Sequence, residues 1–225
     1  MQRWIMLAVA AVGLCGANAT RTVADSGPET PAEAQAVFRC TTNRDNTITI
    51  AGYNGPVGNV TIQGAINGRP VTRIGDHAFE KNTNVTSVTL PASITTIGRS
   101  AFINCSGLTN APLPGGVTRI GAAAFRNCVR LAPVTIPPGV TCIESEVFDG
   151  CASLIRMTVG SAVTNIGPFA FYKCPILTGL YFKGNAPNIE RGAFVLDPKL
   201  TVFYVHGASG WGKTFGDRPT AEWVR

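Results

Sequence analysis

The chain repeats one apolar pattern at a fixed interval of 23 residues. The stretch IGRSAFINCSGL at 97–108 recurs as IGAAAFRNCVRL at 120–131, IESEVFDGCASL at 143–154 and IGPFAFYKCPIL at 166–177. Chance does not hold Ile, Phe, Cys and Leu in register over so many units, so the spacing predicts a solenoid whose coils bury their apolar sides against one another. The Phe column, expected to form an internal ladder, consists of Phe79, Phe102, Phe125, Phe148, Phe171 and Phe194.

The pattern inside one unit predicts the path of one coil. The segment VTSVTLP at 85–91 alternates apolar and polar residues, as a half-buried strand does, and ITTIG at 94–98 predicts a second short extended piece. Stacked in parallel, the longer strands would form a sheet with a spacing of about 4.8 Å, so that six coils measure about 25–30 Å. The Gly that follows Ile in four repeats (Gly75, Gly98, Gly121 and Gly167) is expected at a tight corner, and the following Ala-Phe pair in a short helical turn.

The remaining sequence divides into flanking segments. We expect a signal peptide at 1–19, a flexible linker at 20–37, a β-rich N-terminal cap at 38–70, six repeats at 71–208 and a C-terminal cap at 209–225. Trp211, Phe215 and Trp223 are the residues expected to cover the last coil.

The first 19 residues have the features of an export signal. Arg3 precedes an apolar run from Trp4 to Leu14, and Ala17-Asn18-Ala19 is a small-x-small cleavage site. The run is shorter than the roughly 20 residues that a membrane-spanning helix needs, and no later stretch approaches that length. The sequence therefore predicts a protein processed after Ala19 and exported to the periplasm, the cell surface or the medium.

The unit V-T-x-I-G-x-x-A-F-x-x-C-x-x-L-x-x-V-x-I-P resembles the BspA-like leucine-rich repeats, a bacterial family with 23-residue units. The flanks, ITIAGYNGPVGNVTIQGAINGRPVTRIG at 48–75 and FYVHGASGWGKTFGDRPTAEW at 203–223, resemble the lead-in and closing segments of the same family. The resemblance implies a leucine-rich repeat solenoid, and a protein that is exported and contacts other proteins or host and matrix components.

Four of the seven cysteines belong to the repeat: Cys105, Cys128, Cys151 and Cys174. We expect an inward ladder of small apolar thiols. Disulfide bridges between neighbouring coils stay open as an alternative, because the expected Cα spacing of about 5 Å permits them. A zinc site is disfavoured because no C-x-x-C pair occurs. Cys142 lies outside the ladder and is expected to be the accessible thiol.

Nothing in the sequence assembles a catalytic or cofactor site. Neither His77 nor His206 has a nucleophile or carboxylate placed beside it by the repeat pattern, and no phosphate-binding loop occurs, so we expect no enzyme and no cofactor. The formal charge of +6 comes without a cluster of Lys and Arg. This distribution argues against a nucleic-acid partner.

The outward positions of the predicted sheet are the candidate binding surface. The spacing places one outward column at Ser87, Asn110, Pro133, Arg156, Gly179 and Val202, and a second at Thr89, Pro112, Thr135, Thr158, Tyr181 and Tyr204. Exposed Tyr beside Arg is typical of interface hot spots. The candidate site is therefore Arg156, Thr158, Tyr181, Lys183 and Tyr204.

These residues allow more than one function. The first hypothesis is a monomeric recognition module for another protein. The alternatives are a glycan-binding module that stacks sugars on Tyr181 and Tyr204, and an envelope spacer without a ligand, whose aromatic residues only pack on the C-terminal cap.

Overall fold

The computed structural model describes residues 12–15 and 38–223. The predicted linker at 20–37 and most of the predicted signal peptide lie outside the described residues. Strand β1 (Val12–Cys15) falls inside the predicted signal peptide and pairs antiparallel with β2 (Phe38–Thr42).

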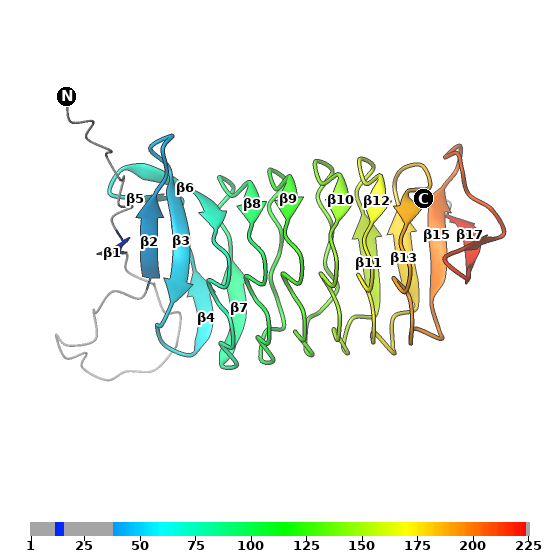
Figure 1. The fold of residues 1–225 in the computed structure, drawn as a ribbon, viewed down its shortest axis with the longest axis horizontal. Coiled ribbons are helices and arrows are strands. Elements are labelled where there is room, and N and C mark those ends of the chain that lie inside the picture. The colour runs from blue at the N-terminus through cyan, green and yellow to red at the C-terminus, as the bar shows by residue number, and fades with distance from the viewer. Residues whose placement is uncertain (1–11, 16–37, 224–225) are drawn as a thin grey trace, which may run out of the picture.

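The chain winds into a stack of similar coils that follow one another along the long axis of the molecule, from the N-terminal strands at the left to the C-terminal strands at the right (Figure 1). One side of the stack consists of parallel strands in two sheets, and all but the first two of these strands are two residues long. The first sheet holds β3 (Ile48–Tyr53), β6 (Arg69–Ile74), β8 (Thr96–Ile97) and β9 (Arg119–Ile120), and the second holds β10 (Cys142–Ile143), β12 (Asn165–Ile166) and β14 (Asn188–Ile189). A second side carries longer strands: β4 (Gly58–Thr61), β7 (Val85–Thr89), β11 (Arg156–Val159), β13 (Gly179–Phe182), β15 (Thr201–Val205) and β17 (Arg218–Trp223). The predicted solenoid with parallel sheets is confirmed.

The longer strands form two separate ladders instead of one continuous sheet. β4 pairs with β7, and β11, β13, β15 and β17 pair in parallel, whereas only single bridges, Ser87 to Asn110 and Thr135 to Thr158, mark the two coils between them. Those coils place Pro112 and Pro133 inside the strand segment. Since proline has no N–H to donate, it interrupts the ladder there.

The third side of each coil is a run of hydrogen-bonded turns, in the place where short helical turns were expected; the described residues contain no helix. Every repeat places two residues of this run in the left-handed region, for example Ser100 (φ 53°) and Asn104 (φ 60°). The corner glycines have little room, because a Cβ on Gly121 would lie 2.6 Å from the Arg99 nitrogen. A side chain there would force the neighbouring coil to move.

An aromatic stack runs through the interior. Phe102 and Phe125 have ring centroids 5.2 Å apart and Phe125 and Phe148 5.7 Å apart, with nearly parallel planes. The stack begins at Phe38 and Tyr53 and continues through Phe171 and Phe194, each of which is almost fully buried. Each coil therefore covers the ring of the one before it.

The repeat cysteines are buried thiols that link consecutive coils. Cys105 donates its Sγ–H to the carbonyl oxygen of Phe79 at 2.9 Å, and Cys128 donates to that of Phe102 at 3.1 Å. Asn82 occupies this column in the first repeat, and its amide Nδ2 lies 3.5 Å from the Tyr53 carbonyl oxygen. The column thus holds a hydrogen-bond donor aimed at the preceding coil, in addition to a small apolar side chain.

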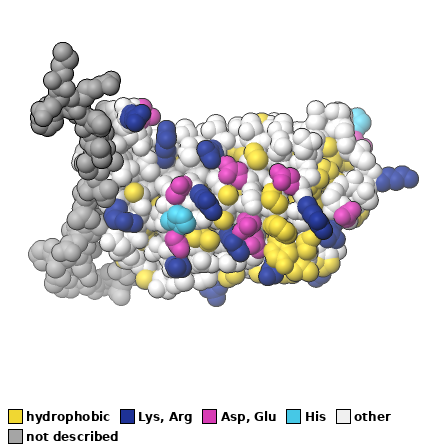
Figure 2. All heavy atoms as spheres, viewed as in Figure 1, with side chains coloured by type: hydrophobic (Ala, Val, Ile, Leu, Met, Phe, Trp, Pro, Cys, Tyr) yellow, Lys and Arg dark blue, Asp and Glu magenta, His cyan; other side chains and the backbone are white. Residues whose placement is uncertain are grey.

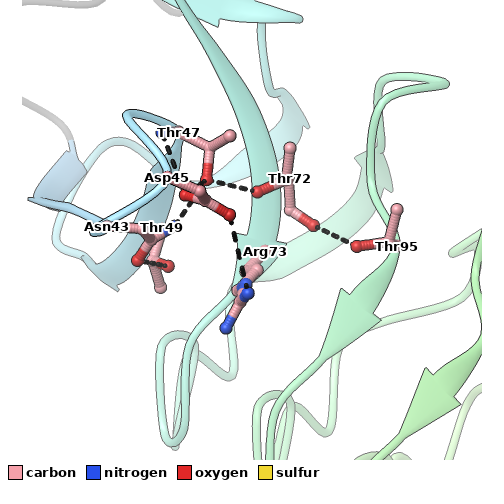
Figure 3. Close-up of polar contacts among 7 residues, drawn as sticks. All are labelled: Asn43, Asp45, Thr47, Thr49, Thr72, Arg73 and Thr95. Carbon is pink, nitrogen blue, oxygen red and sulfur yellow. Dashed lines mark hydrogen bonds and ion pairs between the residues drawn. The ribbon is translucent and has the colours of Figure 1, made fainter.

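Threonines add a second polar ladder at the edge of the short strands. Thr95 donates its hydroxyl to the carbonyl oxygen of Thr72 at 3.3 Å, and Thr118 donates to that of Thr95 at 3.4 Å. Figure 3 shows how the N-terminal coil joins this ladder through a 2.9 Å hydrogen bond between the hydroxyls of Thr72 and Thr47. The Thr47 hydroxyl also donates to Asp45, the main reason that the pKa of Asp45 lies below its usual value.

Both ends of the stack are covered by chain that departs from the repeat. At the N-terminal end, β2 pairs antiparallel with β3, and Tyr53 stacks on Phe79 at 5.1 Å. At the C-terminal end, β16 (Thr214–Phe215) and β17 form a hairpin, and Trp211 and Phe215 pack against the core. Trp223, expected to cover the last coil with them, instead lies against Tyr181 on the longer-strand side.

Truncating one ring in the middle of the stack tests this packing. We expect Phe125→Ala to lower the free energy of unfolding by about 3–5 kcal/mol, since both neighbouring rings lose a contact and a cavity remains. Urea titration monitored by circular dichroism measures the change. The exposed Arg130→Ala in the same coil is the control, expected to stay within about 0.5 kcal/mol of the parent. A loss below about 1 kcal/mol for Phe125→Ala would show that the stack is not a core.

Candidate functional site

The outward face of β11, β13, β15 and β17 holds most of the predicted site residues. Arg156 and Thr158 lie on β11 and point outward, because the alternating residues Met157 and Val159 are buried. Tyr181 lies beside Thr158 in the register, half-buried, and the exposed Lys183 follows β13 directly. These four side chains therefore share one face of a regular parallel ladder, which makes their backbone positions rigid.

Tyr204 is the exception, and its expected place beside Tyr181 is corrected by the strand register. β13 begins two residues after Leu177, but β15 begins one residue after the equivalent Leu200. Tyr181 therefore pairs with Phe203, and Tyr204 pairs with Phe182. A shift of one residue turns every side chain to the other face of a strand. Val202, expected outward, is accordingly fully buried, and Val205, expected inward, falls on the outward side with Phe203.

Packing against the C-terminal segment explains this register. Tyr204 stacks on Trp211 with ring centroids 5.2 Å apart and planes 4° apart, and Trp211 also contacts Phe182 at 5.1 Å. The indole N–H of Trp211 donates to the Gly184 carbonyl oxygen at 3.2 Å. Tyr204 thus closes the interior at the last coil instead of contributing to the outward face.

Three aromatic side chains, Tyr181, Phe203 and Trp223, form what we call the sheet-face cluster. The rings of Tyr181 and Phe203 stack at 4.7 Å with planes 6° apart, and Trp223 meets Tyr181 edge-on at 5.3 Å. Gly179 makes room for the Tyr181 ring, because a Cβ on Gly179 would lie 2.6 Å from that ring. Sequence spacing missed Phe203 because the register changes in the last repeat, although the alternation of TVFYV, with Val202 and Tyr204 inward, was a signal for it.

The orientation of these rings bears on what they could contact. Tyr181 and Phe203 turn one face each toward the other, and the Tyr181 ring leans along its strand over Gly179, with its hydroxyl 3.1 Å from where a Cβ of that glycine would lie. Arg156 and Lys183 stand at the same face with exposed side chains. Rigid aromatic side chains bordered by cations are the composition of protein interface hot spots, whereas sugar stacking needs open ring faces.

The two histidines each contact a carboxylate, which the repeat pattern did not predict. The Nδ1 of His77 lies 2.8 Å from the Oε2 of Glu80, and His206 pairs with Glu222. All four side chains are exposed or partly exposed. No hydrogen bond to either histidine from a Ser or Cys occurs among residues 38–223, and no group of metal-binding side chains forms in the described chain.

Asp197 is the carboxyl group with the largest pKa change. It replaces Cys in the last repeat and is fully buried; its Oδ1 accepts a hydrogen bond from the Cys174 N–H at 2.7 Å, while its Oδ2 has no hydrogen-bond partner in the described part of the chain. Burial raises its pKa to about 7, against the opposing effects of that N–H and of Arg218. Burial of this carboxyl group in the column of thiols, with one oxygen unpartnered, is therefore the structural cause of its altered pKa.

Burial also keeps the repeat thiols protonated. It raises the pKa of Cys105 to about 12 and that of Cys128 well above its ordinary value, which fits their role as hydrogen-bond donors. Cys142 is partly exposed, and its pKa is raised by burial and by Glu144 and Glu190. A raised pKa disfavours the thiolate, so this accessible thiol lacks the activation of a catalytic cysteine.

Comparisons with known proteins agree with this geometry. Residues 71–201 match the family described as the BspA type leucine rich repeat region, in six copies. A leucine-rich repeat protein of T. pallidum is 30% identical, with 80% of this chain and 87% of that chain covered and a TM-score of 0.68. A leucine-rich cell surface protein of Faecalibacterium prausnitzii is 30% identical, with 81% and 56% covered and a TM-score of 0.58.

A pneumococcal vaccine antigen, 15% identical with a TM-score of 0.57, shares the fold alone. The comparison with curated proteins finds no relative of the chain. Leucine-rich repeat proteins typically act by binding instead of catalysis, and these similarities bring no evidence of an enzyme. Within the described residues, no helix is long and apolar enough to cross a membrane.

The buried Asp197 predicts a specific pH dependence. Its folded-state pKa of about 7 lies above the unfolded value of about 3.9, so the folded state binds the extra proton and stability falls as pH rises between about 4 and 7. Asp197→Asn keeps a hydrogen-bonding side chain without the ionisation. Urea unfolding at pH 5 and pH 8 should show the parent losing stability relative to the variant at the higher pH. Equal pH profiles for the two proteins would refute the assignment.

Proposed function

We propose that this chain, which belongs to the BspA-type leucine-rich repeat family, is an exported recognition module. Its partner is another protein, bound on the outward face of β11, β13, β15 and β17. The sheet-face cluster forms the centre of this contact, and Arg156, Thr158 and Lys183 border it. The coils before it act as a rigid spacer that presents the surface.

The observation that carries the proposal is the change in side-chain type along one outward row. The row runs Thr135, Thr158, Tyr181 and Phe203, so two small polar residues are followed by two large aromatic ones. The fold itself is satisfied by Thr at this row, as the earlier coils show. Half-buried aromatic side chains on a rigid ladder lose little conformational entropy on binding, which favours them as anchors.

Two alternatives receive less support. A glycan-binding module would use open ring faces, but Tyr181 and Phe203 stack on each other and Tyr204 stacks on Trp211. An envelope spacer without a ligand would use outward aromatic side chains only for packing on the C-terminal segment, as Tyr181 packs on Trp223. Packing against the C-terminal segment accounts for the position of Tyr204, but it leaves Arg156 and Lys183 exposed beside the cluster.

Export is part of the proposal and rests on the N-terminal sequence. Arg3, the apolar run to Leu14 and the Ala17-Asn18-Ala19 site have the order of a cleavable signal. The similar F. prausnitzii protein is described as a cell surface protein. We place the processed chain outside the cytoplasm, as a monomer whose sheet face is open to partners.

A capture experiment with matched variants tests the proposal. The bait is the exported, processed protein, and the prey are envelope and extracellular-matrix extracts. Tyr181→Thr/Phe203→Thr removes two anchors and inserts the residue type that Thr135 and Thr158 already provide in the same row. A specific protein partner retained by the parent should bind this variant about 30-fold more weakly or worse, which is the loss expected for hot-spot residues.

Val129→Ser is the control, because it removes an exposed apolar side chain from an earlier coil, inserts the residue that Ser106 provides one repeat before, and leaves the sheet face intact. If the parent, the control and the double variant all capture the same protein equally well, the partner binds a surface other than the sheet-face cluster. Retention of glycans from a protease-treated extract, lost in the double variant, would favour the glycan alternative. Failure of the parent to retain either class would favour the spacer.

A further inference from the structure

A second apolar surface lies on the turn side of the last two repeats. Figure 2 shows hydrophobic side chains gathered toward the C-terminal end of the stack on the face in view. The turn-side patch consists of Phe169, Tyr172, Ile176, Val195 and Leu196. Leu196 is 55% exposed and Phe169 and Val195 are 43% exposed. Apolar clusters of this kind on a folded surface mark interaction sites.

Two of these residues occupy positions where large apolar side chains are unfavourable. Phe169 and Leu196 have φ values of 56° and 67°, in the left-handed region that disfavours bulky side chains. The equivalent positions in other repeats are mainly small, polar or Gly: His77, Ser100, Ala123, Glu146 and Gly192 for the first, and Lys81, Asn104, Asn127, Gly150 and Lys173 for the second. Folding therefore does not require Phe or Leu here, which points to a function for their exposed surfaces.

The patch spans two consecutive coils and is held in place by them. A Cβ on Gly192 would lie 2.6 Å from the ring of Phe169, so the missing side chain lets this ring lie over the next coil. Phe169 meets Tyr172 edge-on at 5.6 Å. The Lys173 N–H donates to the Val195 carbonyl oxygen at 3.2 Å, which ties Tyr172 and Lys173 to the coil that carries Val195 and Leu196.

The charges around the patch are mostly positive. The Lys173 ammonium lies 4.9 Å from the centroid of the Tyr172 ring, Arg191 adjoins Gly192, and Lys199 occupies the position of Ile176 in the next coil. None of these three cations has an ion pair within residues 38–223. Of the acids in these coils, Glu146 and Asp149 both contact Arg126, Asp197 is buried, and Glu190 is exposed.

We infer that the turn-side patch is a docking surface for an anionic lipid bilayer. Phe169, Val195 and Leu196 lie in the hydrogen-bonded turns and are 43–55% exposed, so a flat interface can reach them. Aromatic and aliphatic side chains that enter the headgroup region, with Lys and Arg beside them for anionic headgroups, are the chemistry of peripheral membrane binding. No spanning segment is involved.

The docking surface is separate from the proposed protein-binding face. The turn-side patch precedes the strand in each repeat, and the sheet-face cluster lies on the strand itself, so the two occupy different sides of the coil. A bilayer on the turn side therefore leaves Tyr181 and Phe203 accessible. Lipid docking goes beyond the proposed recognition function, and either can hold without the other.

Vesicle co-sedimentation tests the inference. The exported protein is mixed with vesicles of phosphatidylcholine alone or of phosphatidylcholine with phosphatidylglycerol. We expect binding to the anionic vesicles and little to the neutral ones, weakened when salt rises from about 0.1 M to about 0.5 M. Phe169→Ser/Leu196→Asn inserts the residues found at the equivalent Ser100 and Asn104, so it suits the left-handed backbone and should keep or raise the melting temperature. It should weaken vesicle binding by about ten-fold or more.

Tyr181→Thr/Phe203→Thr is the control and should bind anionic vesicles like the parent. The parent and both variants carry the same processed N-terminus, so any contribution of the N-terminus to vesicle binding is the same in all three. The inference is overturned if the parent does not bind anionic vesicles, or if Phe169→Ser/Leu196→Asn binds them equally well. A partner protein that depends on Phe169 and Leu196, without vesicle binding, would likewise overturn it and assign the patch to a protein.

Discussion

The structure depends on contacts between consecutive coils, because no single coil can bury its own apolar side. The Phe column shows this most directly: its ring centroids lie 4.9 Å apart at Phe79 and Phe102 and 5.9 Å apart at Phe171 and Phe194, near the spacing of neighbouring strands. The thiols of Cys105 and Cys128 and the hydroxyl of Thr95 add hydrogen bonds to the same coil-to-coil contacts. A position inside this stack varies little from coil to coil, with Asn82 and Asp197 as terminal exceptions in the Cys column, while a position pointing outward varies freely.

The informative residues are therefore those that depart from their column at the surface. On the longer-strand side, Tyr181 and Phe203 replace the Thr of earlier coils. On the turn side, Phe169 and Leu196 occupy left-handed positions that small, polar or charged residues fill in the other repeats. Both departures fall in the last two repeats but on different sides of the coil. A rigid stack that carries two distinct surfaces could hold a partner protein while it lies on a membrane.

Spacing alone was enough to predict the solenoid, the inward Phe column and the tight corner at Gly121, because these follow from a strict period. The change of register in the last repeat was not predictable from the period: it depends on Tyr204 packing on Trp211, a contact with chain outside the repeats. Pro112 and Pro133 are visible in the sequence, but the period of the repeat does not show that strand pairing breaks at their two coils. The turn-side patch was missed because its significance lies in the positive φ of Phe169 and Leu196, which only the backbone shows.

The central claim is that the bulky residues in the last two repeats serve binding and not folding. The direct measurement is the free energy of unfolding of a variant that combines Tyr181→Thr, Phe203→Thr, Phe169→Ser and Leu196→Asn. The account predicts a total loss below about 2 kcal/mol, because each new residue already fits its column elsewhere in the chain. A loss in the range expected for a buried Phe, about 3–5 kcal/mol or more, would contradict it and show that these side chains are part of the core.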